Sequence, residues 1–174
     1  AGYPEGKRAS ESLCQAYIQK YGIDVVIPRI SRTFGPTMLL SDSKASSQFI
    51  MNAVHKENIV LKSAGTQLYS YAYVADIVSA LLFLLVKGQK GEAYNVSNEH
   101  CDITLRTFAE TLANVAGTKV IHGEATAQEK QGFSKATKAL LDNQKIYALG
   151  WRPLYDSMEE PLKHTIKILE GSGN

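Results

Sequence analysis

Tyr3 and Lys7 are the two residues of this sequence whose types and spacing best suggest chemistry, because they stand four positions apart where a helix is expected to begin. Four helical residues rise about 6 Å, so both side chains project from one face. A phenol with its ordinary pKa near 10 is a poor base at neutral pH, but a nearby ammonium favours the phenolate. Moving that pKa close to 7 takes roughly 4 kcal/mol, which would need a second positive charge in a dry pocket. The same spacing also arises by chance, as a tyrosine that packs against a solvated lysine.

Composition limits the classes of protein to consider. The chain has 174 residues, of which 44% are apolar and 21% charged, and a formal charge of +2. These values are typical of a soluble globular domain, and the scattered basic residues predict no nucleic-acid partner. The most apolar run, 77–86, is shorter than the roughly 20 residues of a membrane span, so we expect no membrane insertion. Cys14 and Cys101 have no metal or redox spacing and fit a reducing cytoplasm, and the four histidines are dispersed, so we predict no metal site.

The first third of the sequence alternates helix and strand patterns. Residues 4–22 predict a helix that stops at Gly22, and the β-branched run 23–30 predicts a buried parallel strand ended by Pro28. Residues 31–43 should form a loop, and residues 43–58 a helix capped near Ser43. This order is half of a βαβ unit.

The alternation continues to the end of the chain. Short strands are expected at 58–62 and 69–74 around a turn at Gly65, followed by a helix over 74–88 that is apolar nearly all round and should be buried. A strand at 91–97, a helix over 104–117 capped by Thr104, a strand at 119–124, a short helix stopped at Gly150 and an amphipathic helix over 156–171 complete the prediction. The pattern predicts an α/β fold, although no strand is followed by a glycine-rich phosphate loop.

Several segments in order resemble one known family. YPEGKRASE, YGIDVVIPRISRTFGPTM, SYAYVADIVSALLFLLVKGQKGEAYNVSNE and LLDNQKIYALGWRP resemble the carboxyl-terminal half of the extended short-chain dehydrogenase/reductases, the NAD-dependent nucleotide-sugar epimerase/dehydratase family. The resemblance implies the end of a Rossmann-type sheet with its helices over 1–36 and about 70–97. It implies a small α/β substrate-binding subdomain over about 37–69 and 98–174. It also implies that the chain is a fragment that would be inactive alone.

The resemblance also implies roles for particular residues. Tyr3 takes the position of the catalytic acid/base, and Lys7 that of the lysine that binds the nicotinamide ribose. Pro28, Arg29 and Ile30 fall where the family's backbone passes beside the nicotinamide. The implied cofactor is NAD, with NADP possible.

Two positions depart from the family pattern. Arg32 stands where the family often has an asparagine that contacts the substrate; an arginine can bind a diphosphate, or form a salt bridge on a loop. Tyr69 stands where the family commonly has a diphosphate-binding arginine, and it can stack on a base or pack in the core. Asn95 has two readings, a satisfied turn residue or a substrate contact. Asp76 is expected to hydrogen-bond loop backbone rather than take part in chemistry.

Two functions remain open at this point. The first is an NAD-dependent nucleotide-sugar epimerase or dehydratase, with decarboxylation also possible, acting in the cytoplasm in surface-polysaccharide precursor synthesis. The second is a non-catalytic nucleotide-binding sensor or scaffold that retains the fold. Because relatives often dimerise through the helix that carries the tyrosine and lysine, we also predict a homodimer.

Overall fold

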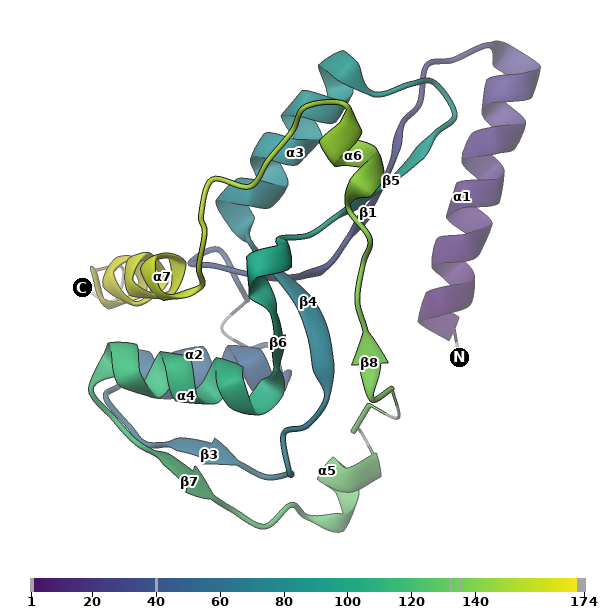
Figure 1. Ribbon diagram of the computed structural model, residues 1–174. Helices are drawn as coiled ribbons and strands as arrows, with labels where there is room; N and C mark the ends of the chain where they lie inside the picture. The colour runs from purple at the N-terminus through teal and green to yellow at the C-terminus, as the bar shows by residue number, and fades with distance from the viewer. Residues whose placement is uncertain (1, 40, 132, 135, 172–174) are drawn as a thin grey trace.

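The computed structural model describes residues 2–39, 41–131, 133–134 and 136–171, and Figure 1 shows the course of the chain. In chain order, the helices and strands are α1 (Gly2–Tyr21), β1 (Ile27–Ile30), β2 (Arg32–Phe34), α2 (Ala45–Val54), β3 (Ile59–Leu61), β4 (Leu68–Tyr73), α3 (Val74–Lys87), β5 (Ala93–Val96), the 3₁₀ turn η1 (Glu99–Cys101), β6 (Asp102–Thr104), α4 (Leu105–Ala116), β7 (Val120–His122), α5 (Ala127–Gln131), β8 (Lys138–Ala139), α6 (Gln144–Ala148) and α7 (Glu159–Gly171). The predicted α/β fold is therefore confirmed.

The strands form small, mostly parallel sheets. β1 pairs in parallel with β5, and β3 in parallel with β7. β4 lies between β2, which is parallel to it, and β6, which is antiparallel, while β8 pairs with one end of β4. In Figure 1 the β1–β5 pair lies between α3 and α1. The strands expected around Gly65 exist as β3 and β4, but they pair with other strands and not with each other.

The strand containing Pro28 corrects one prediction. Pro28 does not end the strand, because β1 runs from Ile27 through Pro28 to Ile30. The N–H groups of Ile27 and Ser31 donate to carbonyl oxygens of the β5 side, so the position without an N–H falls on the opposite edge of β1. A proline is tolerated on the edge of a strand that makes no ladder bond there.

The expected loop over 31–43 also begins as a strand. Residues Arg32–Phe34 form β2, with Arg32 opposite Tyr71 on β4. The helix that follows starts at Ala45 and is not capped by Ser43. Instead the carboxylate of Asp42 accepts hydrogen bonds from the Lys44 N–H and the Ser47 hydroxyl. Thr104, by contrast, caps α4 as predicted, since its hydroxyl accepts the Thr107 N–H at 3.0 Å.

Helix α3 is buried on one face only. Its buried residues are Asp76, Ile77, Ala80 and Leu84. The opposite face carries Val78, Leu82, Leu85 and Val86, which are exposed. The prediction that this helix is covered all round is therefore wrong for the part of the chain described here. Periodicity did not separate the faces because both are apolar.

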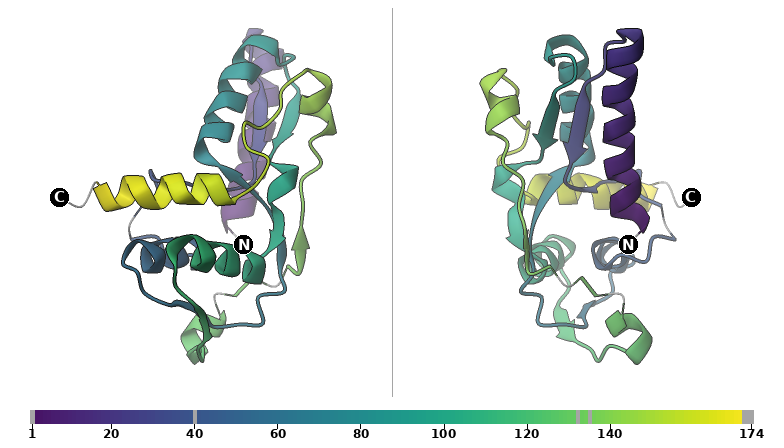
Figure 2. Two further views of the ribbon diagram at one scale, coloured as in Figure 1. Left: turned by 60° about the vertical axis from the view of Figure 1, so that its left-hand side comes forward. Right: turned by 90° about the vertical axis from the view of Figure 1, so that its right-hand side faces the viewer.

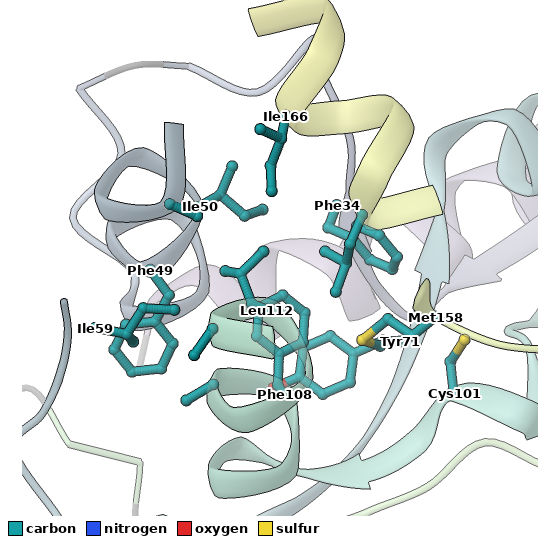
Figure 3. Close-up of a cluster of buried hydrophobic side chains, with 14 of the residues drawn as sticks. Phe34, Phe49, Ile50, Ile59, Tyr71, Cys101, Phe108, Leu112, Met158 and Ile166 are labelled. Carbon is teal, nitrogen blue, oxygen red and sulfur yellow. The ribbon is translucent and has the colours of Figure 1, made fainter. Parts of the chain in front are cut away.

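Two hydrophobic clusters hold the chain together. The larger joins β2, β3, β4, α2, α4 and α7 around Phe108, Tyr71 and Leu112 (Figure 3). Figure 2 shows α7 lying across α2 and α4, with which it packs. The smaller cluster joins α3, β5 and α6, and it contains Trp151, whose indole N–H donates to the Ser79 hydroxyl at 3.0 Å. The two-part division of the chain stays a prediction.

Within the described ranges, no helix is long and apolar enough to cross a membrane. The same ranges contain no group of three or more histidine, cysteine, aspartate or glutamate side chains that would hold a metal ion.

Candidate active site

Tyr3 and Lys7 lie together on the first turns of α1. The Lys7 Nζ stands over the Tyr3 ring, 5.4 Å from its centroid. An ammonium over an aromatic face is attracted by the ring quadrupole, and it places positive charge beside the phenol. Tyr3 is 78% exposed as a residue, so its ring is not wedged among aliphatic side chains. The shared face expected from the spacing is present, and the catalytic roles stay a prediction.

The face that carries this pair continues toward the β1–β5 sheet. Glu11 and Gln15 follow Lys7 at four-residue intervals, so the four side chains form one slowly turning stripe. The Glu11 carboxylate bonds to Arg29, and the Gln15 amide donates to the Gly91 carbonyl at 2.7 Å. Because α1 runs opposite to β1, its first turns extend past the carboxyl end of that strand (Figure 1). Ligands of parallel α/β sheets bind at this edge.

Apart from Tyr3 and Lys7 on α1, the residues predicted to contact the cofactor lie on β1. Pro28 and Arg29 pair with Tyr94 and Asn95 of β5, and Ile30 is partly exposed at the carboxyl end of the strand. The side chain of Arg29 is occupied by Glu11, whose pKa is lowered because its carboxylate accepts hydrogen bonds from the guanidinium. Any cofactor contact at these positions is left to the backbone and to Ile30, and it stays a prediction.

A cleft of about 790 Å³ lies beside β2, β3 and β4. Its wall contains two of the predicted substrate-binding residues, Arg32 and Tyr69. The remaining lining comes mainly from α2 and its start, the end of β3, the start of α4, the start of α5, and Phe133 and Ser134. Tyr3 and Lys7 do not line it, so the structure brings the predicted residues together in two separate groups.

Arg32 and Tyr69 are in direct contact in this cleft. The Arg32 guanidinium lies 3.7 Å from the centroid of the Tyr69 ring. Tyr69 is only 4% exposed, and its hydroxyl donates to the Ala136 carbonyl at 3.3 Å. Stacking fixes the plane of the guanidinium and leaves its N–H edge for an anion. The sequence reading that Tyr69 packs in the core is thereby supported, while its place in the wall leaves substrate contact a prediction.

Basic side chains line the cleft. Arg32, Lys44 and Lys62 line it, and none of its lining residues is acidic among those that the structure describes. Lys44 is held by the Asp42 carboxylate at 2.8 Å. Burial raises the pKa of Tyr71, another lining residue, to about 12, so its hydroxyl stays protonated. The arrangement suits a polyanion such as a diphosphate.

Asn95 and Asp76 make structural contacts. The Asn95 amide donates to the Asp142 carbonyl at 2.9 Å, which ties β5 to the segment before α6, and its proposed substrate contact stays a prediction. Asp76 is fully buried, and its carboxylate accepts the Leu154 N–H at 2.7 Å. Burial raises the pKa of Asp76. The expectation that Asp76 would bond loop backbone is confirmed.

Sequence reasoning missed several residues of these sites. Lys44, Lys62 and Phe133 line the cleft without belonging to a motif. Glu11 gave a usable signal, since it stands four residues after Lys7 on a helix whose face was already assigned.

Residues 1–97 match the family described as NAD dependent epimerase/dehydratase. The chain belongs to this family. The match covers α1, the β1–β5 sheet and most of the cleft wall.

Individual members of the family are similar over nearly the whole chain. UDP-glucuronic acid decarboxylase 1 of Xenopus tropicalis is 32% identical over 180 residues, covering 100% of this chain and 41% of its own length. The dTDP-D-glucose 4,6-dehydratase of Mus musculus is 28% identical over 95% of this chain and 46% of its own length. The chain thus spans less than half the length of these curated relatives.

Solved structures agree on the fold. The UDP-glucose 4-epimerase of Thermotoga maritima, solved with UDP-glucose, superposes with a TM-score of 0.84 at 22% identity, covering 99% of this chain and 54% of that one. The dTDP-glucose 4,6-dehydratase DesIV of Streptomyces venezuelae, solved with NAD, gives a TM-score of 0.78 at 24% identity, covering 95% of this chain and 50% of that one. At these identities the likeness establishes the Rossmann-type α/β fold.

NAD is the cofactor of this family. The residues of this chain fit one end of the NAD molecule. Lys7 can donate hydrogen bonds to ribose hydroxyls beside an exposed phenol, at the edge of the sheet where such ligands lie. The sequence has no glycine-rich loop after a strand to take the pyrophosphate. The residues present therefore fit the nicotinamide end.

Proposed function

We propose that this chain provides the acid/base pair and the substrate cleft of an NAD-dependent enzyme that acts on a nucleotide sugar, as an epimerase, dehydratase or decarboxylase. The observation that carries the proposal is the Lys7 ammonium over the Tyr3 ring, on the face of α1 that meets the β1–β5 sheet. The names of the relatives, which include UDP- and dTDP-sugar enzymes, support this substrate class.

In this proposal Tyr3 moves the proton of the reaction. When bound, NAD supplies the oxidation and later re-reduction of a sugar carbon. Tyr3 accepts the proton of the hydroxyl on that carbon and returns it in the reverse step. Lys7 holds the ribose and favours the phenolate through its charge, because an ammonium nearby lowers the free energy of the ionised phenol.

The cleft lined by Arg32 takes the nucleotide part of the substrate. Arg32 presents a stacked guanidinium that can bind two phosphate oxygens, and it would replace the arginine that the family commonly has at the position of Tyr69. The proposal also includes the predicted contact of Asn95 with the substrate. It includes the predicted contacts of Pro28, Arg29 and Ile30 with the nicotinamide.

Turnover by a protein that contains this chain tests the proposal. Purified whole protein is mixed with NAD and with UDP- or dTDP-sugars, and the absorbance of reduced nicotinamide and the sugar products are followed. We expect turnover that Tyr3→Phe lowers by about 10²- to 10⁴-fold, the usual range for loss of a general acid/base. Residues 1–174 alone should give none, since the sequence lacks the pyrophosphate loop. Turnover unaffected by Tyr3→Phe would contradict the assignment of Tyr3 as the acid/base.

A non-catalytic sensor is the second candidate, and one observation favours it. Tyr3 and Lys7 do not line the cleft that contains Arg32 and Tyr69, so this chain alone does not show both halves of a reaction site facing one space. If the protein is a sensor, we expect tight nucleotide binding without formation of reduced nicotinamide. Tyr3→Phe should then leave nucleotide binding unchanged.

We propose a homodimer in the cytoplasm as the working form. The support is an apolar stripe on α1, where Leu13, Tyr17 and Tyr21 recur at four-residue spacing and are about half exposed. Patches of this kind mark association sites. Both cysteines are free thiols, as expected in a reducing compartment. Light scattering should give twice the monomer mass, and Tyr17→Lys should give monomers, with the exposed Leu39→Lys as the control.

A further inference from the structure

Helix α1 is attached to the rest of the chain through a few polar contacts and the partly buried side chains of Cys14 and Ile18. It spans 20 residues, and none of those described is buried. A helix of this length is marginal in water without tertiary packing, so its order and orientation depend on the contacts that it makes. On the face that carries Tyr3 and Lys7, these are made by Glu11 and Gln15.

The contact between Glu11 and Arg29 is a two-bond fork. The Arg29 Nε donates to one carboxylate oxygen of Glu11 at 2.8 Å, and a terminal nitrogen of the same guanidinium donates to the other oxygen at 2.6 Å. Two parallel bonds between planar groups fix both distance and rotation. Gln15 makes a single bond to the Gly91 carbonyl, about which the helix can still turn.

The fork joins the helix that carries Tyr3 and Lys7 to the strand that carries the predicted nicotinamide contacts. Glu11 lies one turn after Lys7 on the same stripe, and Arg29 lies on β1 next to Ile30. A rotation of α1 about its axis would swing Tyr3 and Lys7 away from the carboxyl end of β1. No other ionised side chain is recorded in contact with this pair within the described residues.

We propose that Glu11 and Arg29 are positioning residues, and that their fork sets the rotation of α1 and so aims Tyr3 and Lys7 at the substrate. The existence of a substrate at this site rests on the proposed function, but the effect of the fork on the helix can be measured without any substrate. As an exposed ion pair the fork adds little to global stability. Its effect is on direction.

Amide hydrogen exchange tests the structural half of this proposal. In Glu11→Gln, the hydrogen-bonded amides of the first turns of α1, up to residue 11, should exchange about fivefold faster, while those of α4 keep their protection. Glu5→Gln is the matched control, because Glu5 pairs with Arg8 inside the helix and touches no strand. The reversed pair, Glu11→Arg with Arg29→Glu, should restore protection. Equal exchange in Glu11→Gln and Glu5→Gln would overturn the proposal.

Kinetics of the whole protein test the other half. Glu11→Gln should lower kcat by about 10- to 100-fold through misplacement of the reacting groups, with KM for the nucleotide sugar unchanged because the Arg32 cleft is intact. The reversed pair should recover most of kcat. A raised KM at constant kcat would contradict the positioning role. A wild type without turnover would count against the proposed function, and exchange would then decide the role of the fork.

Discussion

The guanidinium of Arg32 on β2 stacks on the ring of Tyr69 on β4, 3.7 Å from its centroid. The two residues meet because β2 and β4 pair in parallel with Arg32 opposite Tyr71, and Tyr69 lies two positions away on the same face. An arginine from one strand therefore lines the cleft beside a tyrosine from the neighbouring strand.

Removal of Arg32 should weaken nucleotide binding. Arg32→Ala deletes a charge-assisted contact worth about 1.5–3 kcal/mol, so we expect a loss of affinity for UDP or dTDP of roughly 10- to 150-fold by titration calorimetry. Tyr69→Phe keeps the stacking ring and should bind nearly as wild type. Arg106→Ala is the control, since that guanidinium bonds to the Ala64 carbonyl and does not line the cleft. Equal affinity of Arg32→Ala and wild type would show that the cleft holds something else.

Removal of the Asp76 carboxylate should destabilise the chain. Asp76→Ala leaves the Leu154 N–H and the Asn98 amide without their carboxylate partner in a fully buried site. We expect about 2–4 kcal/mol lower free energy of unfolding in urea. The exposed Asp24→Ala should stay within about 0.5 kcal/mol of wild type. Comparable losses in both variants would remove Asp76 from the structural network.

Stability should also depend on pH through Asp76. Burial raises the pKa of this carboxyl group in the folded chain, so the fold binds the proton more readily than the unfolded chain does. Its contribution is fully present below the ordinary pKa of about 4 and is lost as pH rises through the folded pKa. Wild type should therefore lose stability relative to Asp76→Asn over that rise. A constant difference between the two urea midpoints across this window would contradict the shift.

Two glycines form a matched pair that separates backbone strain from crowding. Gly65 and Gly117 have similar φ values, 65° and 70°, so alanine costs about 1 kcal/mol of strain at both. At Gly65 a Cβ would also lie 3.0 Å from the Arg106 backbone nitrogen, whereas at Gly117 nothing lies within 4 Å. We expect Gly65→Ala to cost a further 1–3 kcal/mol by thermal unfolding, about the range for overpacking. Equal melting temperatures of Gly65→Ala and Gly117→Ala would mean that the turn at Gly65 can shift to make room for the added Cβ.

Local signals predicted the parts of the fold that depend on neighbours in sequence. The helix with Tyr3 and Lys7, its stop at Gly22 and the Thr104 cap all follow from spacing and capping chemistry. The errors came from pairing across the chain. Pro28 sits inside β1 because β5 lies on the other edge, and β2 exists because β4 is beside it.

The candidate site divides in the same way. The family resemblance picked out Arg32 and Tyr69 one at a time, but their contact requires the register of two strands. Lys44 and Lys62 reach the cleft from a helix start and a strand end, which no short motif encodes. The exposed face of α3 could not be predicted, because both faces of the helix are apolar and the sequence pattern does not show which of them packs against other elements.

The single tryptophan provides a built-in optical probe. Trp151 belongs to the smaller hydrophobic cluster, where its indole bonds to Ser79, and the sequence contains no other tryptophan. Its emission therefore reports the melting of that cluster alone, whereas far-ultraviolet circular dichroism averages over every helix. Superimposable curves from the two signals would mean that the two hydrophobic clusters melt as one cooperative unit, and separated curves would mean that they melt independently.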